Sequence, residues 1–197
     1  MPTFDNDFHF ILAALDQLES YLLTKDIYRP IGIRAPRGEP PYPQFTLGSL
    51  LLAKERSQVT AQSPAEKAQL AGKLNELEAI RSKWRSAWGL KATAEFRSRL
   101  KLWSDYLSEY RDEPEAHDDR YAYEISRRVM LELLRPDTID LPSADEELLT
   151  VVDNMLRAVL APGEFLWEEP LRMAFPEETY WYLYGFLPKT PNKITVE

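Results

Sequence analysis

A proline-rich stretch carries the residues of this sequence that are best suited to binding chemistry. Residues 26–46 contain five prolines and carry Arg29, Arg34 and Arg37 together with Tyr42. Arginine guanidinium groups bind carboxylates and phosphates through two parallel hydrogen bonds, and aromatic side chains supply anchor area at interfaces. Prolines also reduce the entropy that a loop loses on binding. We therefore expect this loop to bind a ligand or a partner; the alternative is that its arginines only solvate it.

Aromatic residues are concentrated in a second stretch, the tail from 164 to 188. We expect this tail to pack as a lid over the end of a helical bundle, and the alternative is that its rings line a pocket. We include Trp181 among the ligand- or partner-binding candidates. The aromatic residues of the tail are Phe165, Trp167, Phe175, Tyr180, Trp181, Tyr182, Tyr184 and Phe186.

Catalytic and metal-binding chemistry find little support. The chain has two histidines and no cysteine, which excludes disulfides, thiolate zinc sites and cysteine nucleophiles. His117 and the acids around it offer oxygen ligands for a hard cation, but acids in a first helical turn are expected from the helix dipole alone. No phosphate-binding loop, nucleophile elbow or two-histidine helix is present. We assign no catalytic residue, metal site or cofactor, and whether any carboxylate pair is catalytic stays open.

A basic stretch, 81–101, has seven bases and one acid, whereas 102–197 has 21 acids and nine bases. Bases interleaved with Trp84, Trp88 and Trp103 suggest nucleic-acid binding. However, the tryptophans lie on the apolar stripe of a helix, and the pI near 5.0 argues against that function. We expect the acidic part to fold back onto the basic helix. The spacing of Lys91, Glu95 and Arg99 predicts a ladder of surface ion pairs.

The longest predicted element is a central helix over 64–111. Ser63 and Glu66 form a capping box around Pro64, and an apolar stripe continues from Leu70 to Tyr110. Gly89 is its weak point, because a glycine inside a helix costs about 1 kcal/mol relative to alanine. We expect one long helix that is bent or kinked near Gly89. A full break into two packed helices is the alternative.

Apolar periodicity and capping signals predict the remaining elements. We expect helices over 5–24, 47–58 and 115–134, and a further helix that begins with a capping box at Ser143 and ends at Pro162. The stretch 26–46 is the longest without helical periodicity. The sequence thus predicts an all-α fold: a single domain over 1–197, built as an elongated bundle of about five or six helices.

Function is less determined than fold. No apolar run approaches the roughly 20 residues that span a membrane, so we expect a soluble, cytoplasmic protein. Our leading hypothesis is a non-enzymatic interaction or scaffold protein that binds a protein partner or a second copy of itself. A helical bundle that binds a small ligand is the first alternative. A nucleic-acid binder that uses residues 81–101 comes next, and an enzyme last.

Overall fold

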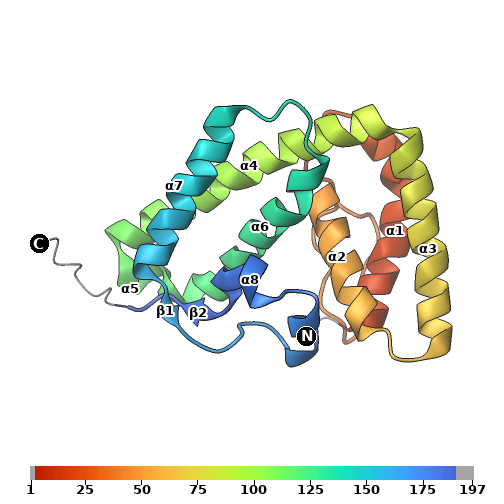
Figure 1. Ribbon diagram of the computed structural model, residues 1–197. Coiled ribbons are helices and arrows are strands. Elements are labelled where there is room, and N and C mark those ends of the chain that lie inside the picture. The colour runs from red at the N-terminus through yellow and green to blue at the C-terminus, as the bar shows by residue number, and fades with distance from the viewer. Residues whose placement is uncertain (1–2, 190–197) are drawn as a thin grey trace, which may run out of the picture. The chain divides into compact units, whose positions relative to one another are not determined.

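The computed structural model describes residues 3–189, which are mostly helical (Figure 1). The prediction of an all-α fold is confirmed. No helix in the described chain is long and apolar enough to cross a membrane. Two short helices, α5 (Pro114–His117) and α8 (Glu177–Tyr180), accompany six longer ones: α1 (Phe4–Leu22), α2 (Leu47–Thr60), α3 (Pro64–Lys83), α4 (Arg85–Asp112), α6 (Tyr121–Leu134) and α7 (Ser143–Val159).

The chain divides into two compact units. As far as the structure describes them, the first unit contains residues 3–96 and 130–140, and the second contains 97–129 and 141–189. Both α4 and α6 contribute residues to each unit. The expectation of a single domain stays a prediction.

The first unit is built around α1, which lies against both α2 and α3 (Figure 1). Its inward face is mainly apolar, and Phe10, Ile11 and Leu18 are each at most 1 % exposed. The buried Asp7 on the same helix pairs with Arg56 of α2. Capping fixes where the neighbouring helices begin. Thr46 caps α2, and Ser63 and Glu66 form the predicted capping box at the start of α3. Satisfied N–H groups at these ends allow the helices to start within a packed unit.

The predicted central helix is interrupted at Trp84, not at Gly89. Trp84 has φ −109° and ψ 30°, and it separates α3 from α4. Figure 1 shows α4 leaving α3 at a sharp angle there. The hydrogen bonds continue through the bend, because the Trp84 N–H donates to the Ile80 carbonyl and the Trp88 N–H donates to that of Trp84. The expected kink at Gly89 is therefore wrong in position, since Gly89 lies inside α4.

Close approach of another segment explains the glycine at 89. A Cβ on Gly89 would lie 2.7 Å from Cγ2 of Ile139, a distance that real Cβ atoms do not adopt. Thr93 holds the Ile139 segment in place, because its hydroxyl donates to the Ile139 carbonyl at 2.8 Å and accepts from the Ile139 N–H at 2.9 Å. Ile139 is β-branched and stiff, so it cannot withdraw cheaply.

Replacing Gly89 with alanine should lower the free energy of unfolding by about 1–3 kcal/mol, because the added methyl group overpacks the contact with Ile139. Urea unfolding followed by circular dichroism measures the effect. Gly72→Ala is the matched control: Gly72 lies within α3 with open space around it, so alanine should stabilise the protein by about 0.5–1 kcal/mol. Adding Ile139→Ala to Gly89→Ala should restore stability. Equal effects of the two glycine substitutions would contradict this account.

Lys91, Glu95 and Arg99 are buried, so the prediction that they form a ladder on the surface is wrong in its placement. Their exposures are 5 %, 0 % and 6 %. The Lys91 ammonium donates to the carbonyls of Thr24 and Asp26, both at 2.7 Å, and it lies 4.4 Å from the ring centroid of Tyr21. Spacing along one helix identified these residues as neighbours, but it could not show that other segments cover them.

Lys91 holds the beginning of the segment 23–46, and the Glu95 carboxylate holds its end, where α2 begins. Both of its oxygens accept from the Gly48 N–H, at 3.0 and 3.1 Å, in the first turn of α2. A carboxylate is stabilised there by the free N–H groups and the dipole of the helix. α4 thus fixes the chain just after α1 and again at the beginning of α2.

Lys91→Met should cost about 2–4 kcal/mol of unfolding free energy, because it removes two charge-assisted hydrogen bonds and leaves their carbonyls unsatisfied. Lys101→Met is the control, since that ammonium pairs with Asp105 on a side chain that is 75 % exposed; its loss should cost about 0.5 kcal/mol or less. Thermal and chemical denaturation compare the two. Similar small losses for both would show that Lys91 contributes no more than a surface charge.

The second unit packs aromatic residues around a buried ion pair. Arg128 on α6 forms a bidentate ion pair with the carboxylate of Asp153 on α7, with N–O distances of 2.8 and 2.9 Å. The guanidinium also lies 4.6 Å from the ring centroid of Tyr182, which is completely buried. A short antiparallel pair, β1 (Ala161–Pro162) and β2 (Gly185–Phe186), closes the base of the tail. The tail is therefore packed into this unit.

Two helix starts in this unit differ from the sequence prediction. The predicted helix over 115–134 is divided into α5, a 3₁₀ turn and α6. Ser143 is the first residue of α7 and follows Pro142, and no side-chain hydrogen bond caps this helix. The predicted capping box at Ser143 is therefore wrong. The Asp145 carboxylate lies 3.0 Å from Nε of Arg97 instead.

Candidate binding groove

The proline-rich loop is closed at its base by a single antiparallel pairing. Arg29 and Phe45 exchange backbone hydrogen bonds of 3.1 and 2.7 Å. Phe45 is fully buried, and its ring centroid lies 4.5 Å from that of Tyr21. The Tyr21 hydroxyl donates to the Ile27 carbonyl at 2.7 Å. These contacts bring the two ends of the loop together.

Side chains of α1 then hold the loop along the helix. Gln17 donates its amide hydrogen to the Ile31 carbonyl at 2.7 Å, and Asn6 donates to the Pro40 carbonyl at 3.1 Å. Gly32 and Gly38 have φ of 77° and 94°, a conformation that favours glycine and allows the loop to reverse. The loop is thus positioned by the scaffold although it has no regular secondary structure.

A groove of about 380 Å³ lies between α1 and this loop. The α1 side contributes residues at steps of three, one, three and one, which is one continuous face of a helix. The loop side contributes Ile33, Arg34, Pro36 and Tyr42. Sequence reasoning identified Arg34 and Tyr42 but missed the α1 residues. The signal that could have identified the α1 residues was their helical spacing next to the buried stripe. These residues are His9, Leu12, Ala13, Asp16 and Gln17.

A second hollow of about 310 Å³ lies along the loop and shares Ile33, Arg34 and Tyr42 with the groove. Ile33 is 50 % exposed, which is unusual for an aliphatic side chain of this size. Within the described chain, the backbone N–H groups of Ile33 and Arg34 donate no hydrogen bond. Both hollows are therefore bordered by the loop residues Ile33 and Arg34, which offer an exposed apolar side chain and two backbone N–H groups that donate no hydrogen bond within the described chain.

Charged side chains at the groove have no ion-pair partner in the described part of the chain. Within residues 3–189, neither Arg34 nor Arg37 forms an ion pair or a side-chain hydrogen bond, and the same holds for Asp16. Both arginines are exposed. Tyr42 is half-buried with its ring 6.0 Å from that of Phe10. Burial, and secondly the charge of Glu39, raise the pKa of the Tyr42 hydroxyl above its ordinary value. Tyr42 therefore remains a neutral hydrogen-bonding group at physiological pH.

Arg29 and Trp181, the other two predicted site residues, lie elsewhere. Arg29 donates to Ser20 Oγ and Thr24 Oγ1 at 3.2 and 3.0 Å, and it pairs with Asp26 at 3.5 Å. These bonds give it partners within the first unit. Trp181 belongs to the second unit, where the Arg157 guanidinium lies 3.6 Å from its ring centroid. The structure thus brings together Arg34 and Tyr42 in one groove, with Arg37 on the same loop.

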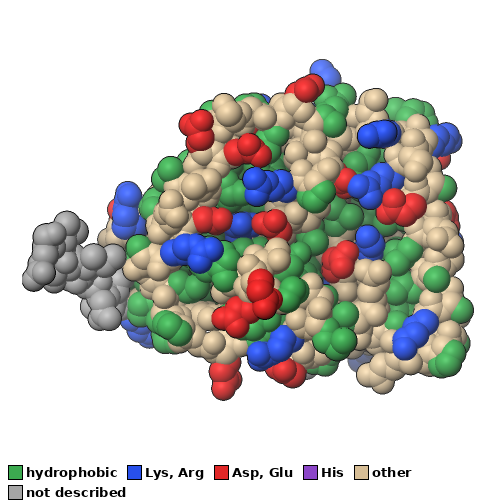
Figure 2. All heavy atoms as spheres, in the orientation of Figure 1, with side chains coloured by type: hydrophobic (Ala, Val, Ile, Leu, Met, Phe, Trp, Pro, Cys, Tyr) green, Lys and Arg blue, Asp and Glu red, His purple; other side chains and the backbone are tan. Residues whose placement is uncertain are grey.

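Part of the basic stretch pairs with acids that follow it in the chain, as the sequence predicts, whereas Lys83 pairs with Glu19, which precedes it. Arg81 pairs with Asp137, and Arg97 pairs with Asp145. Asp137 also accepts from the Trp88 indole N–H at 2.8 Å. Figure 2 shows acidic and basic side chains interspersed on the displayed face, without a continuous basic patch. This distribution does not favour nucleic-acid binding, which uses clustered bases.

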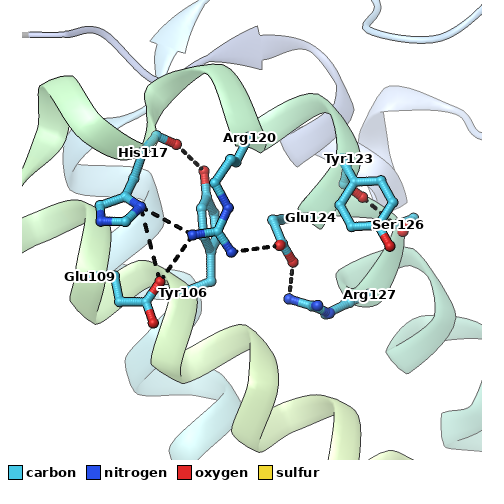
Figure 3. Close-up of polar contacts among 8 residues, drawn as sticks. All are labelled: Tyr106, Glu109, His117, Arg120, Tyr123, Glu124, Ser126 and Arg127. Atoms are coloured by element: carbon cyan, nitrogen blue, oxygen red, sulfur yellow. Dashed lines mark hydrogen bonds and ion pairs between the residues drawn. The ribbon is translucent and has the colours of Figure 1, made fainter.

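His117 belongs to a network of ion pairs (Figure 3). Its Nδ1 lies 3.1 Å from the Arg120 guanidinium, which also pairs with Glu109 and Glu124 at 3.2 and 3.0 Å. Glu124 has a side chain only 2 % exposed and is paired a second time by Arg127. The carboxylates and guanidiniums of this network neutralise one another. Within the described residues, no group of three or more His, Asp or Glu side chains is arranged to hold a metal ion.

Two buried tyrosines of the second unit have raised pKa values, and one of them, Tyr106, lies under the Arg120 guanidinium of this network. Tyr106 donates to the His117 carbonyl at 3.0 Å, and Tyr121 donates to the Tyr182 carbonyl at 2.6 Å. Burial is the main cause that raises the pKa of both hydroxyls well above the ordinary value. These protonated hydroxyls therefore stabilise the fold below the pKa of a tyrosine in the unfolded chain, about 10, and this contribution is lost as the pH rises further.

Above about pH 10, each such tyrosine should lower the free energy of unfolding by about 1.4 kcal/mol per pH unit, because the unfolded chain releases a proton that the folded chain retains. Tyr121→Phe should flatten this alkaline slope by about that amount. Urea unfolding at pH 9, 10 and 11 measures it. Tyr123→Phe, at a position on α6 that is 74 % exposed, controls for the loss of one hydroxyl. An unchanged slope in Tyr121→Phe would contradict the assignment.

Comparison with models of protein families, with curated proteins and with solved structures found no match for this chain. A functional conclusion therefore depends on the chain's own geometry.

Proposed function

We propose that this chain is a non-enzymatic protein-interaction module whose groove binds an extended peptide segment with an acidic residue next to an aliphatic one. The observation that carries the proposal is the position of Arg34. This exposed guanidinium, which has no partner among residues 3–189, borders a mainly apolar groove built on α1.

Three parts of the groove have a corresponding feature in such a peptide. An aliphatic side chain would rest on Leu12, Ala13 and Tyr42, where burial of apolar area is favourable. A carboxylate would accept two parallel hydrogen bonds from Arg34. The free N–H groups of Ile33 and Arg34 would donate to the peptide backbone, as an exposed edge does when it binds an extended segment.

The fixed loop also reduces the cost of binding. Its prolines restrict its backbone, the Arg29–Phe45 pairing closes its base, and the bonds from Gln17 and Asn6 attach it to α1. Preorganisation increases affinity because less conformational entropy is lost. Binding sites on loops held by a rigid scaffold are common for the same reason. The open form of the groove favours a peptide over a small ligand, because small ligands bind in pockets that cover most of their surface.

Selection from a displayed library of short random peptides tests this function. Peptides enriched on the parent protein should carry Asp or Glu beside Leu, Ile or Val. Arg34→Ala should weaken their binding, measured by fluorescence anisotropy, by about tenfold or more, because a hydrogen-bonded charge contributes about 1.5–3 kcal/mol. Arg34→Lys should recover only part of the affinity, because lysine keeps the charge without the planar fork.

Arg85→Ala is the matched control, since Arg85 is an exposed arginine of the same unit that lies outside the groove. It removes the same charge and should leave binding unchanged. All three variants should keep the parent's helix content and melting temperature. Enriched peptides that bind Arg34→Ala as tightly as the parent would refute the proposal, as would a library that yields no binder dependent on Tyr42 or Arg34.

A further inference from the structure

The proline-rich loop runs antiparallel to α1, which gives the groove a direction. Gln17, in the C-terminal half of α1, donates to the Ile31 carbonyl, whereas Asn6, near the start of the helix, donates to the Pro40 carbonyl. These two anchors are eleven residues apart on α1, which is about 16 Å at 1.5 Å per residue. One end of the groove is therefore marked by Ile31 and the other by Pro40.

Asp16 lies at the Ile31 end of the groove, one helical turn beyond Leu12 and Ala13. Its side chain is exposed and lines the groove. It forms no ion pair or hydrogen bond with any described residue. Arg34, on the loop side of the same groove, is likewise without a partner in the described chain, so these two opposite charges do not pair with each other. The groove thus offers one charge of each sign.

The other acids of α1 have a role within the fold. Asp5 and Asp7 lie in the first turn, where the helix dipole favours a negative charge. Asp7 also pairs with an arginine of α2, and Glu19 pairs with a lysine at the end of α3. Asp16 lies in the middle of the helix, where the dipole gives it no such benefit. Its charge is therefore available to a molecule in the groove.

The spacing along α1 matches that of an extended peptide. Asp16 follows Leu12 and Ala13 by four and three residues, which is about 4.5–6 Å along the helix axis. Alternate side chains of an extended chain point the same way and are about 6.6 Å apart. A peptide whose aliphatic side chain rests on Leu12 and Ala13 therefore presents the side chain two residues away to Asp16. The residue next to the aliphatic one faces the opposite wall, where Arg34 lies.

We propose that Asp16 is a specificity-determining residue, which selects a lysine or arginine two residues from the aliphatic residue of the bound peptide. This inference rests on the proposed function, because it assigns a second charged contact to the same groove. The recognised segment then carries a base for Asp16 and an acid for Arg34. Uniformly acidic or uniformly basic segments are disfavoured, because each brings like charges together at one of these two residues.

Binding of short synthetic peptides to the full chain tests the role of Asp16. Each peptide carries a fixed Leu-Glu or Glu-Leu pair in a glycine–serine background, with Lys, Met or Glu placed at one other position at a time. Fluorescence anisotropy measures the affinity. At one of the two positions that lie two residues from the leucine, Lys should bind about two- to fivefold more tightly than Met, which is the range of an exposed ion pair. Glu at that position should bind more weakly than Met.

Substitutions at Asp16 assign this preference to its carboxylate. Asp16→Asn should abolish the advantage of Lys over Met and leave the affinity for the Met peptide unchanged, and Asp16→Lys should transfer the preference to Glu. Glu76→Gln is the matched control, since it removes one exposed carboxylate of the same unit outside the groove. It should leave the preference for Lys intact. All three variants should keep the parent's melting temperature, because both side chains are exposed.

The possible outcomes separate this inference from the proposed function. Binding that Arg34→Ala weakens but that shows no preference for Lys, or a preference that persists in Asp16→Asn, overturns the role of Asp16 and leaves the peptide groove intact. Tighter binding of every peptide by Asp16→Asn also overturns it, because Asp16 would then compete with the peptide for Arg34. A preference for Lys that Asp16→Asn removes, in peptides that Arg34→Ala binds as tightly as the parent, supports the role of Asp16 and refutes the proposed recognition of an acid. A parent that binds none of the peptides refutes both.

Discussion

Lys91 joins three parts of the first unit at one buried point. Its ammonium satisfies the carbonyls of Thr24 and Asp26, which follow the end of α1, and it lies over the ring of Tyr21. Burial, and secondly the charge of Arg29, lower the pKa of Lys91 below its ordinary value. Removing a charge from water is costly unless hydrogen bonds and a polarisable ring replace the solvent. The position of the chain after α1 therefore depends on α4.

Glu95 extends the same constraint by one helical turn. It binds the first turn of α2, so adjacent turns of α4 hold the chain on both sides of the proline-rich loop. With its ends fixed, the loop can lie along α1 without forming a strand or a helix. Only a few bonds, from Gln17, Asn6 and the Arg29–Phe45 pairing, are then needed to shape the groove. Buried polar residues on one helix thereby position a binding surface on another.

Some arginines of this chain form ion pairs that stabilise the fold, whereas others are exposed and could bind a partner. Arg81, Arg97 and Arg128 each bind an aspartate that follows them in the sequence, and Glu124 is held between two arginines. The aspartates neutralise the charge of these arginines, so they attract an anionic partner less than an unpaired arginine does. Arg34 and Arg37 differ in being exposed and unpaired within the described residues. The net charge of a segment therefore does not predict binding unless it is known which of its charged side chains form ion pairs within the fold.

The sequence alone determined the all-α fold, most helix limits, the capping of α3, the irregular stretch from 26 to 46 and the pairing of later acids with part of the basic stretch. Apolar periodicity, capping residues and prolines are local signals, and they act over a few residues. Only the tertiary structure decided the bend at Trp84, the contact that requires Gly89, and the burial of Lys91, Glu95 and Arg99. It also divided the predicted site residues, placing Arg34 and Tyr42 against α1 and Trp181 in the other unit. Each of these features depends on segments distant in the chain, and a sequence pattern does not show which segment covers which.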